Sequence, residues 1–179
     1  ALWGFDVFLL RSSFFAGQKL LLFRIEVWSI LWWVVQLYHF VRSFLGQPGG
    51  WGTKFGYASL AIFGVAAIFG YAPPGITYSN GSVSPETGWW FILFFSPIIT
   101  ISALAVYSLV RRLRVLTDSK ERNKVAYLIS AISMLALFGF PGAIPALAHG
   151  FPIGHVGGFL AACILAYAII KHDLVSINS

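Results

Sequence analysis

The chain has 179 residues, of which 58% are hydrophobic and only 10% charged, and its mean hydropathy is +0.80. A soluble domain of this composition would expose large apolar patches and aggregate, so an ordinary soluble protein is excluded and lipid is the expected surrounding. The net charge of +6 is carried by the loops between apolar stretches, and no nucleic-acid-reading motif accompanies it. We therefore expect the lipid bilayer, and not nucleic acid, as a partner.

Long apolar stretches predict membrane-spanning helices, because a bilayer core about 30 Å thick needs roughly 20 apolar residues per helix. The first stretch is too short to cross, and we interpret it as the second half of a helix whose first half is absent, as in a fragment. We expect an all-α membrane protein, a polytopic helical bundle with five complete transmembrane helices and a partial N-terminal one, in a single transmembrane domain over residues 1–179. The expected spans are residues 1–10 (partial), 25–45, 55–71, 89–110, 125–147 and 154–170.

The segments between the spans differ in character. Arg11 to Arg24 mixes basic residues with Phe and Leu, which suits a segment lying along the membrane interface. Gly46 to Lys54 is expected to be a Gly-rich turn. Ala72 to Gly88 contains no Lys or Arg, and within it Ile76 to Ser84 surrounds Asn80-Gly81 with β-prone residues. That pattern predicts a small β-hairpin.

The twelve Lys and Arg residues are divided unevenly if successive spans cross in opposite directions. Cytoplasmic loops carry the excess of Lys and Arg, so the richer side is expected to be cytoplasmic. The C-terminus is then inside the cell and residues 72–88 outside. The inner side receives Arg42, Lys54, Arg111, Arg112, Arg114, Lys120, Arg122, Lys124 and Lys171, whereas the outer side receives only Arg11, Lys19 and Arg24.

The last span carries a stripe of small residues at a four-residue spacing, which predicts one nearly flat helix face that a neighbouring backbone can approach closely. The stripe consists of Gly154, Gly158, Ala162 and Ala166. It suits either a helix that slides against a partner or ordinary tight packing in a bundle. The preceding span is interrupted by Pro141-Gly142 and by Pro145, which indicates either a hinge or the end of that helix.

Four histidines raise the question of a cofactor. His39 and His172 fall near the cytoplasmic ends of their spans, and His149 and His155 near the outer ends. A haem can use paired imidazoles at equal depth and a chlorophyll-type magnesium needs one, but a histidine at a helix end is also an ordinary interfacial residue. We assign no cofactor to them and expect none.

No arrangement of residues predicts an enzyme or a metal site. Cys163 is the single cysteine and lies in an apolar span, so neither an intrachain disulfide nor a thiolate metal cluster is available. The sequence has no Ser/His/Asp order with a nucleophile elbow, no phosphate-binding glycine loop and no HExxH motif. Asp6 is the one ionisable residue that the spans could place deep in the membrane.

Three segments together resemble the seven-transmembrane N-terminal region of bacterial sensor histidine kinases and related signalling proteins. Lys19 to His39, KLLLFRIEVWSILWWVVQLYH, followed by Phe40, resembles the third helix of that family. Glu121 to Leu128, ERNKVAYL, resembles the opening of the sixth helix, which the family ends with a Pro-Gly-Pro pattern, here Phe140 to Pro145. Ile164 to Ile177, ILAYAIIKHDLVSI, resembles the exit into a cytoplasmic output domain.

The resemblance implies a sensory input module of the bacterial inner membrane that lacks the first helix and half of the second and stops just before the kinase. A homodimer partner or other membrane subunits would accompany it. Two alternatives remain from the residues. One is a non-catalytic accessory subunit of a larger membrane complex, such as an energy-transducing assembly, and the other is a haem- or pigment-binding subunit. No phosphoacceptor region or nucleotide-binding motif lies in the chain, so kinase activity is not assigned to it.

Overall fold

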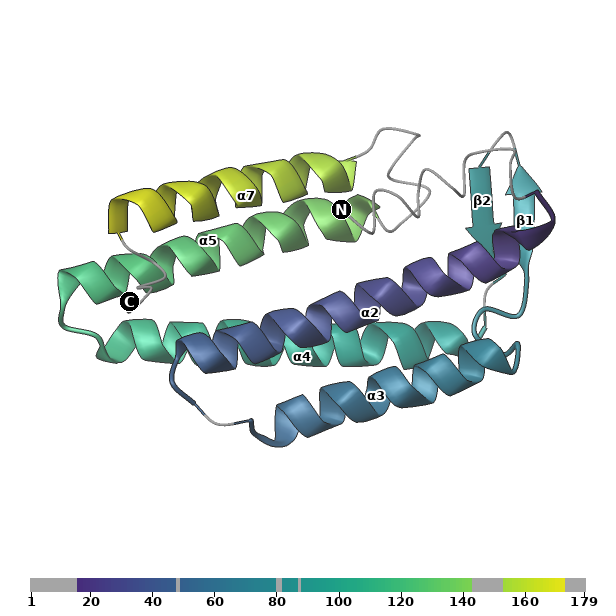
Figure 1. Cartoon of the computed structure of the whole chain (residues 1–179), viewed down its shortest axis with the longest axis horizontal. Helices are drawn as coiled ribbons and strands as arrows, with labels where there is room; N and C mark the ends of the chain where they lie inside the picture. The colour runs from purple at the N-terminus through teal and green to yellow at the C-terminus, as the bar shows by residue number, and fades with distance from the viewer. Residues whose placement is uncertain (1–15, 48, 80–81, 87, 143–152, 173–179) are drawn as a thin grey trace. The chain divides into compact units, whose positions relative to one another are not determined.

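The computed structural model describes residues 16–47, 49–79, 82–86, 88–142 and 153–172. These residues are mostly helical, which confirms the all-α class apart from one small hairpin (Figure 1). Asp6 and the expected partial helix over residues 1–10 lie outside the described residues. The elements are η1 (Ala16–Gln18), α2 (Lys19–Phe44), α3 (Trp51–Ile68), β1 (Ile76–Ser79), β2 (Ser82–Pro85), α4 (Trp90–Val115), α5 (Ser119–Gly142) and α7 (Ile153–His172).

The helices begin and end at different residues from the expected spans. Helix α2 begins at Lys19, so the end of the expected interfacial segment is already helical, and α3 begins at Trp51 inside the expected Gly-rich turn. Helix α4 continues to Val115, and α5 begins at Ser119. The basic segment over residues 111–124, which lies between two expected spans and was expected to be a loop, is therefore a loop only over residues 116–118, because Arg and Lys are good helix formers and hydropathy marks only the apolar part of a helix.

The chain divides into two compact units, residues 1–105 and residues 106–179. In the first unit α2, α3 and the beginning of α4 lie side by side, and α3 runs antiparallel to the other two (Figure 1). Their core consists of the buried residues Val27, Leu31, Leu60, Phe63, Ala72, Trp90 and Phe94. The rings of Phe63 and Phe94 lie with centroids 5.6 Å apart, which joins α3 to α4.

Glycines of α3 bring its backbone close to the neighbouring helices. A Cβ added at Gly52 would lie 2.7 Å from the Tyr38 hydroxyl oxygen and 3.1 Å from Leu104 Cδ1. A Cβ at Gly56 would lie 3.2 Å from side-chain atoms of Val35 and Ile101. A larger residue at either position would require the facing side chains of α2 and α4 to shift, so these glycines let α3 lie close to both helices.

Helices α2 and α3 both end in a Schellman turn. Gly46 and Gly70 have φ angles of 63° and 84°, a left-handed conformation that glycine adopts without steric cost. After α3, the Gly70 amide donates to the Ala67 carbonyl at 3.2 Å and the Tyr71 amide donates to the Ala66 carbonyl at 2.8 Å. The same pair of bonds follows α2, so the chain reverses immediately after each helix.

The predicted hairpin is confirmed. Strand β1 pairs antiparallel with β2, from Ile76 opposite Pro85 to Ser79 opposite Ser82. The register leaves two residues in the loop, which is the connection that the Asn-Gly pair favours. The hairpin joins the end of α3 to the start of α4, where Trp90 Nε1 donates a 2.7 Å hydrogen bond to the Glu86 carbonyl.

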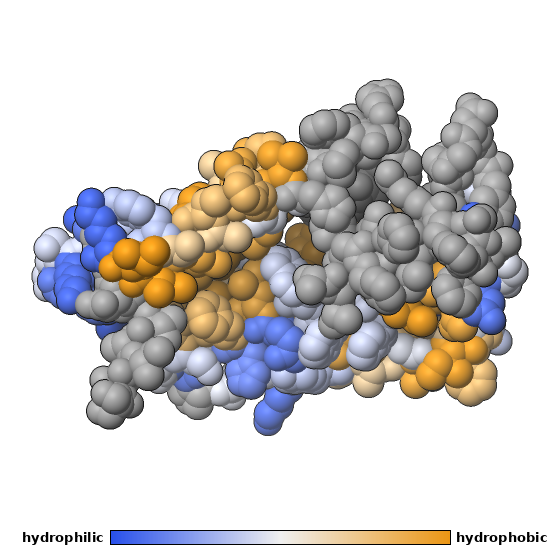
Figure 2. All heavy atoms as spheres, turned by 45° about the horizontal axis from the view of Figure 1, so that its top comes forward, coloured by the Kyte–Doolittle hydropathy of each residue, from blue (hydrophilic) through white to orange (hydrophobic). Residues whose placement is uncertain are grey.

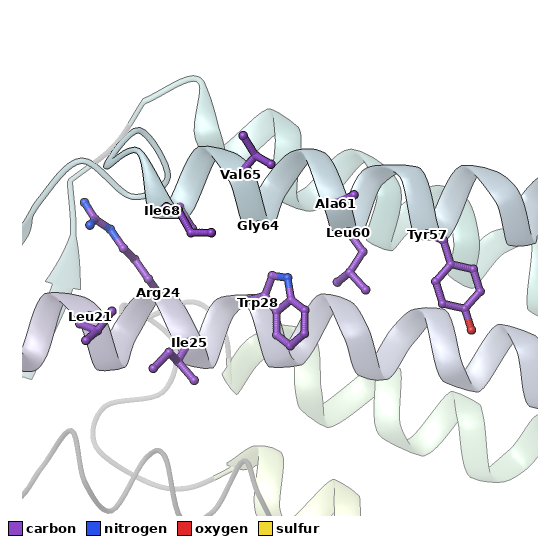
Figure 3. A pocket seen from close by; sticks show the side chains of 11 residues that line it. Leu21, Arg24, Ile25, Trp28, Tyr57, Leu60, Ala61, Gly64, Val65 and Ile68 are labelled. Carbon is purple, nitrogen blue, oxygen red and sulfur yellow. The ribbon is translucent and has the colours of Figure 1, made fainter.

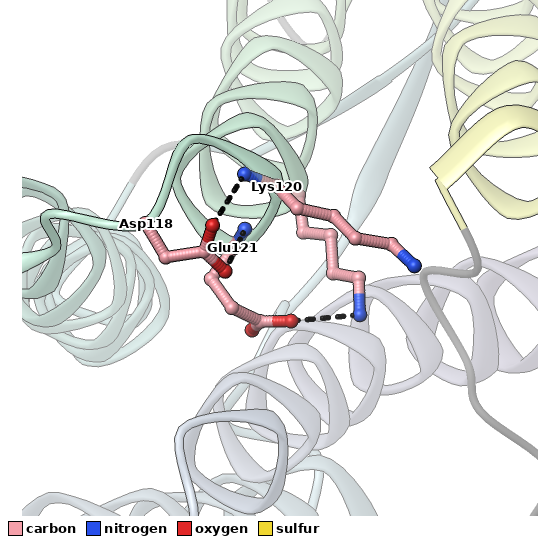
Figure 4. Close-up of polar contacts among 4 residues, drawn as sticks. Asp118, Lys120 and Glu121 are labelled. Carbon is pink, nitrogen blue, oxygen red and sulfur yellow. Dashed lines mark hydrogen bonds and ion pairs between the residues drawn. The ribbon is translucent and has the colours of Figure 1, made fainter.

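In the second unit α7 packs antiparallel against α5 (Figure 1). Asp118 caps the N-terminus of α5, because its carboxylate oxygens accept from the Lys120 amide at 3.2 Å and the Glu121 amide at 3.4 Å (Figure 4). Glu121 also forms a 2.9 Å ion pair with Lys124, one turn further along the helix. A carboxylate at this end of a helix satisfies free amides and interacts favourably with the helix dipole.

Two helices, α2 and α4, are long and apolar enough to cross a membrane, and α7 contains a shorter apolar stretch over Val156–Lys171. Core helices of soluble proteins also pass a test of length and composition, but they are mostly buried, whereas only 22% and 28% of the most apolar windows of α2 and α4 are buried. Broad hydrophobic areas are exposed on the face drawn in Figure 2. Exposed residues of this kind include Trp51, Ile62, Ile68, Phe69, Tyr71, Trp89 and Ile170.

Candidate functional site

Of the four histidines considered as cofactor ligands, the structure describes the surroundings of one. His39 is exposed on α2, and its Nδ1 lies 3.3 Å from the hydroxyl of Tyr57 on α3, which also accepts a 3.1 Å hydrogen bond from Gln36. His149 lies outside the described residues, and the side chains of His155 and His172 are not described. Within the described ranges no three His, Cys, Asp or Glu residues are grouped as a metal site would require.

The Pro-Gly interruption lies at the end of the described part of α5. Pro141 and Gly142 are its last two residues and are still helical, whereas Pro145 lies outside the described residues. Whether this segment is a hinge or the end of the helix stays a prediction.

Small residues of α7 do pack closely, but they are not the four of the predicted stripe. Gly157, Ala161 and Ala168 are buried on one face, and a Cβ added at Gly157 would lie 3.2 Å from the carbonyl oxygen of Met134 in α5. By contrast, a Cβ added at Gly158 would meet nothing within 4 Å. Gly154 is half-buried, and Ala162 and Ala166 are exposed. What packs against the stripe therefore stays a prediction.

Two of the segments that resemble signalling proteins touch each other in the second unit. The rings of Tyr127 in α5 and Tyr167 in α7 meet edge to face, with centroids 5.6 Å apart and an interplanar angle of 63°. The Nζ of Lys171 lies 5.3 Å from the centroid of the Tyr167 ring, within the range of a cation–π interaction. We call this group the exit contact, and it joins the beginning of α5 to the end of α7.

The sequence predicts one of the two interactions in the exit contact, the one between Tyr167 and Lys171, but not the one between Tyr127 and Tyr167. Tyr167 and Lys171 are four residues apart, so a helix places them on the same face. Tyr127 lies forty residues before Tyr167, and no local pattern links them. Only the antiparallel packing of α5 and α7 brings the two rings together.

A second candidate site lies wholly in the first unit. A groove with a volume of about 540 Å³ runs between α2 and α3 (Figure 3). We call it the α2–α3 groove. Its walls are apolar, with Leu21, Ile25 and Trp28 contributed by α2, and Leu60, Val65 and Ile68 contributed by α3. Sites for small apolar ligands have this size and composition.

Gly64 makes room for the indole of Trp28 in the α2–α3 groove. A Cβ added at Gly64 would lie 3.1 Å from Trp28 Nε1. On α2 itself, the Trp28 ring stacks on Trp32 with centroids 6.4 Å apart and planes 4° from parallel. These two contacts fix the orientation of the largest side chain in the groove.

Arg24 is the charged residue of the groove lining, and it lies at one end, with Tyr57 at the other (Figure 3). Its Nε donates to the Pro73 carbonyl at 3.1 Å, and its Nη2 donates to the Gly70 carbonyl at 3.2 Å and to the Pro73 carbonyl at 2.9 Å. The guanidinium thus binds the turn that ends α3, where the helix dipole favours a cation. From the sequence, Arg24 is predicted only to be the last residue of a segment along the membrane interface.

No protein-family model, curated protein or solved structure matches this chain. Its function is therefore inferred from its own residues, in particular from the exit contact in the second unit and the α2–α3 groove in the first.

Proposed function

We propose that this chain is a membrane-embedded sensory module of the bacterial inner membrane, with five complete transmembrane helices, a partial N-terminal one and a cytoplasmic C-terminus. Its helices bind or respond to a stimulus and pass a shift through α7 to an output domain or partner on the cytoplasmic side. The observation that carries the proposal is the exit contact, because it joins two of the three segments in which the resemblance to sensor kinases lies.

The arrangement of the first unit supports the proposed orientation. Arg42 lies at the end of α2 and Lys54 in the first turn of α3, and a Cβ added at Gly50, which precedes α3, would lie 3.3 Å from Arg42 Nη2. These two cations of the expected cytoplasmic set thus share one end of the unit. Arg24, from the expected outer set, lies at the opposite end, against the turn after α3. The alternation that the positive-inside rule requires is therefore compatible with the packing.

A signal in α7 requires two arrangements of similar free energy. Gly157, Ala161 and Ala168 are small residues on the buried face of α7, so its backbone lies close to α5 and a displacement of α7 moves few bulky groups of its own. An aromatic pair contributes about 0.5–1.5 kcal/mol, so making or breaking the Tyr127–Tyr167 contact changes the ratio of two such states by a factor of about two to ten. That range is sufficient for graded control of an output.

The test joins a histidine-kinase catalytic domain to the chain after Ser179 and measures autophosphorylation in membrane vesicles. Tyr127→Ala removes the ring that contacts α7 without altering the fused helix. We expect it to change autophosphorylation by about two- to tenfold, because it removes an aromatic pair of about 0.5–1.5 kcal/mol. Tyr127→Phe keeps the ring and should stay close to the parent.

Tyr107→Ala is the matched control, because Tyr107 is an exposed tyrosine of α4. It should leave the output unchanged. If Tyr127→Ala and Tyr107→Ala behave alike, the chain does not transmit through the exit contact, and an accessory subunit of a larger membrane complex becomes the better explanation.

A further inference from the structure

The guanidinium of Arg24 has unused capacity to bind an anion. Its Nε and Nη2 hydrogens are directed to the carbonyls of Gly70 and Pro73, which are neutral acceptors. Among the described residues no carboxylate pairs with Arg24, and its Nη1 has no hydrogen-bond partner. A full positive charge and two N–H donors therefore remain for a ligand, in the planar geometry that suits a phosphate.

The depth of Arg24 corresponds to the boundary between lipid and water. The turn to which it is bonded follows α3 and is surrounded by large exposed residues, with Ile68 82%, Phe69 72% and Tyr71 75% exposed. Trp89, which immediately precedes α4, is 83% exposed. Aromatic side chains gather at the level of lipid headgroups, where the phosphates of phospholipids lie.

The α2–α3 groove extends from this cation along the apolar parts of both helices. Beyond Arg24 its lining is Leu, Ile, Val, Ala, Gly and Trp, until Tyr57 at the far end. A peptide would bring unsatisfied backbone amides into such a groove, and a free phosphate would leave it unfilled. An acyl chain has no hydrogen-bonding groups to satisfy and fills apolar space at no such cost.

We propose that the α2–α3 groove binds an anionic phospholipid, whose phosphate contacts Arg24 and one of whose acyl chains lies between α2 and α3. The proposal rests on the membrane placement in the proposed function but does not require signalling. Charge complementarity at one end and apolar surface along the rest select a molecule that combines both features.

The test is native mass spectrometry of the full chain, purified from bacterial membranes in mild detergent. Phosphatidylglycerol and phosphatidylcholine with the same acyl chains are added at equal concentration, and retained lipids are counted. We expect phosphatidylglycerol to be retained about fivefold more, because one cation near a membrane surface changes anionic-lipid affinity by about that factor. Arg24→Gln should remove the preference, whereas Arg42→Gln, at the other end of α2, should keep it.

A second pair of variants tests the groove without touching Arg24. Ala61→Phe fills the groove and should reduce retention of both lipids, whereas Ala58→Phe adds the same bulk at another exposed position of α3 that does not line the groove. This pair remains informative even if Arg24→Gln unfolds the turn after α3.

Equal retention of the two lipids by the parent chain would overturn the proposal. It would also be overturned if Arg24→Gln keeps the preference for phosphatidylglycerol, or if Ala61→Phe leaves lipid retention unchanged. Complete competition by inorganic phosphate would show an anion site without a lipid site and would also overturn it. Because no output is measured, these results are independent of the autophosphorylation test, and either proposal can fail alone.

Discussion

Single side chains at helix ends determine much of the local structure in this chain. Arg24 binds carbonyls in the turn that ends α3, and Asp118 binds the free amides that begin α5. Each places a charge where the helix dipole favours it. In the sequence, both residues lie in charged segments between the expected spans. In the structure, Arg24 donates hydrogen bonds to specific carbonyls and Asp118 accepts them from specific amides.

Asp118→Ala should destabilise α5 by about 0.5–2 kcal/mol, because it removes the oxygen acceptors for the first amides of that helix. We expect a thermal unfolding midpoint lower by a few degrees in detergent, measured by circular dichroism. Asp118→Asn keeps a side-chain oxygen and should retain most of the stability. Equal loss in the two variants would mean that charge, and not capping, is the contribution of Asp118.

These two residues also separate what the sequence can predict from what it cannot. The cap on α5 has a local signature, an Asp three residues before Glu121, so it could have been recognised from the sequence. The acceptors of Arg24 lie 46 and 49 residues away, and they come within reach only because α2 and α3 pack antiparallel. Local patterns predict local bonds, and distant bonds depend on packing.

At the scale of the elements, hydropathy located the helices well but not their ends. Helix α4 continues five residues beyond the expected Val110, through three arginines. Hydropathy identifies residues that suit the lipid core, whereas a helix can continue through charged residues outside it. In α7 the buried small residues Gly157, Ala161 and Ala168 are spaced by four and then seven residues, so a search for a four-residue repeat finds the set that includes Gly158 and misses this one.

Neighbouring glycines of α7 give a matched test of the α5–α7 contact. Gly157→Ala places a Cβ against Phe138 and Met134, and we expect it to destabilise the pair by about 1–3 kcal/mol. Gly158→Ala enters open space and should be neutral or stabilising by up to about 1 kcal/mol, since alanine favours helix. Thermal unfolding of both variants in detergent measures the difference.

An effect of Gly158→Ala on the assembly state would have a different explanation from an effect on unfolding. If Gly158→Ala leaves unfolding unchanged but shifts the chain to a smaller species in size-exclusion chromatography, the predicted stripe packs against another copy or subunit. If both glycine variants unfold alike, the packing face of α7 described above is incorrect.

For the whole molecule, the distribution of charge predicts which loops face the cytoplasm. The test uses single cysteines in a Cys163→Ala background, with Glu86→Cys after the hairpin and Thr117→Cys between α4 and α5; both positions are exposed. In intact cells we expect a membrane-impermeant maleimide to label position 86 and not position 117. Position 117 should react only after the membrane is opened.

Labelling of position 117 but not position 86 from outside would reverse the proposed topology and remove the basis of the sensory proposal. Labelling of both positions without opening the membrane would mean that the segment between them, which contains α4, does not cross it.

The Schellman turn after α3 has a consequence for the proposed membrane placement. Helix α3 has 18 residues and is therefore about 27 Å long. It begins directly after the Gly49-Gly50 pair, and the turn at Gly70 ends it. Helix α2 has 26 residues and reaches about 39 Å. Under the proposed membrane placement, two adjacent helices of such unequal length match different hydrocarbon thicknesses, so a thicker bilayer would thin beside α3 while α2 tilts to fit. The backbone turns that set the length of α3 would then build a hydrophobic mismatch into the first unit.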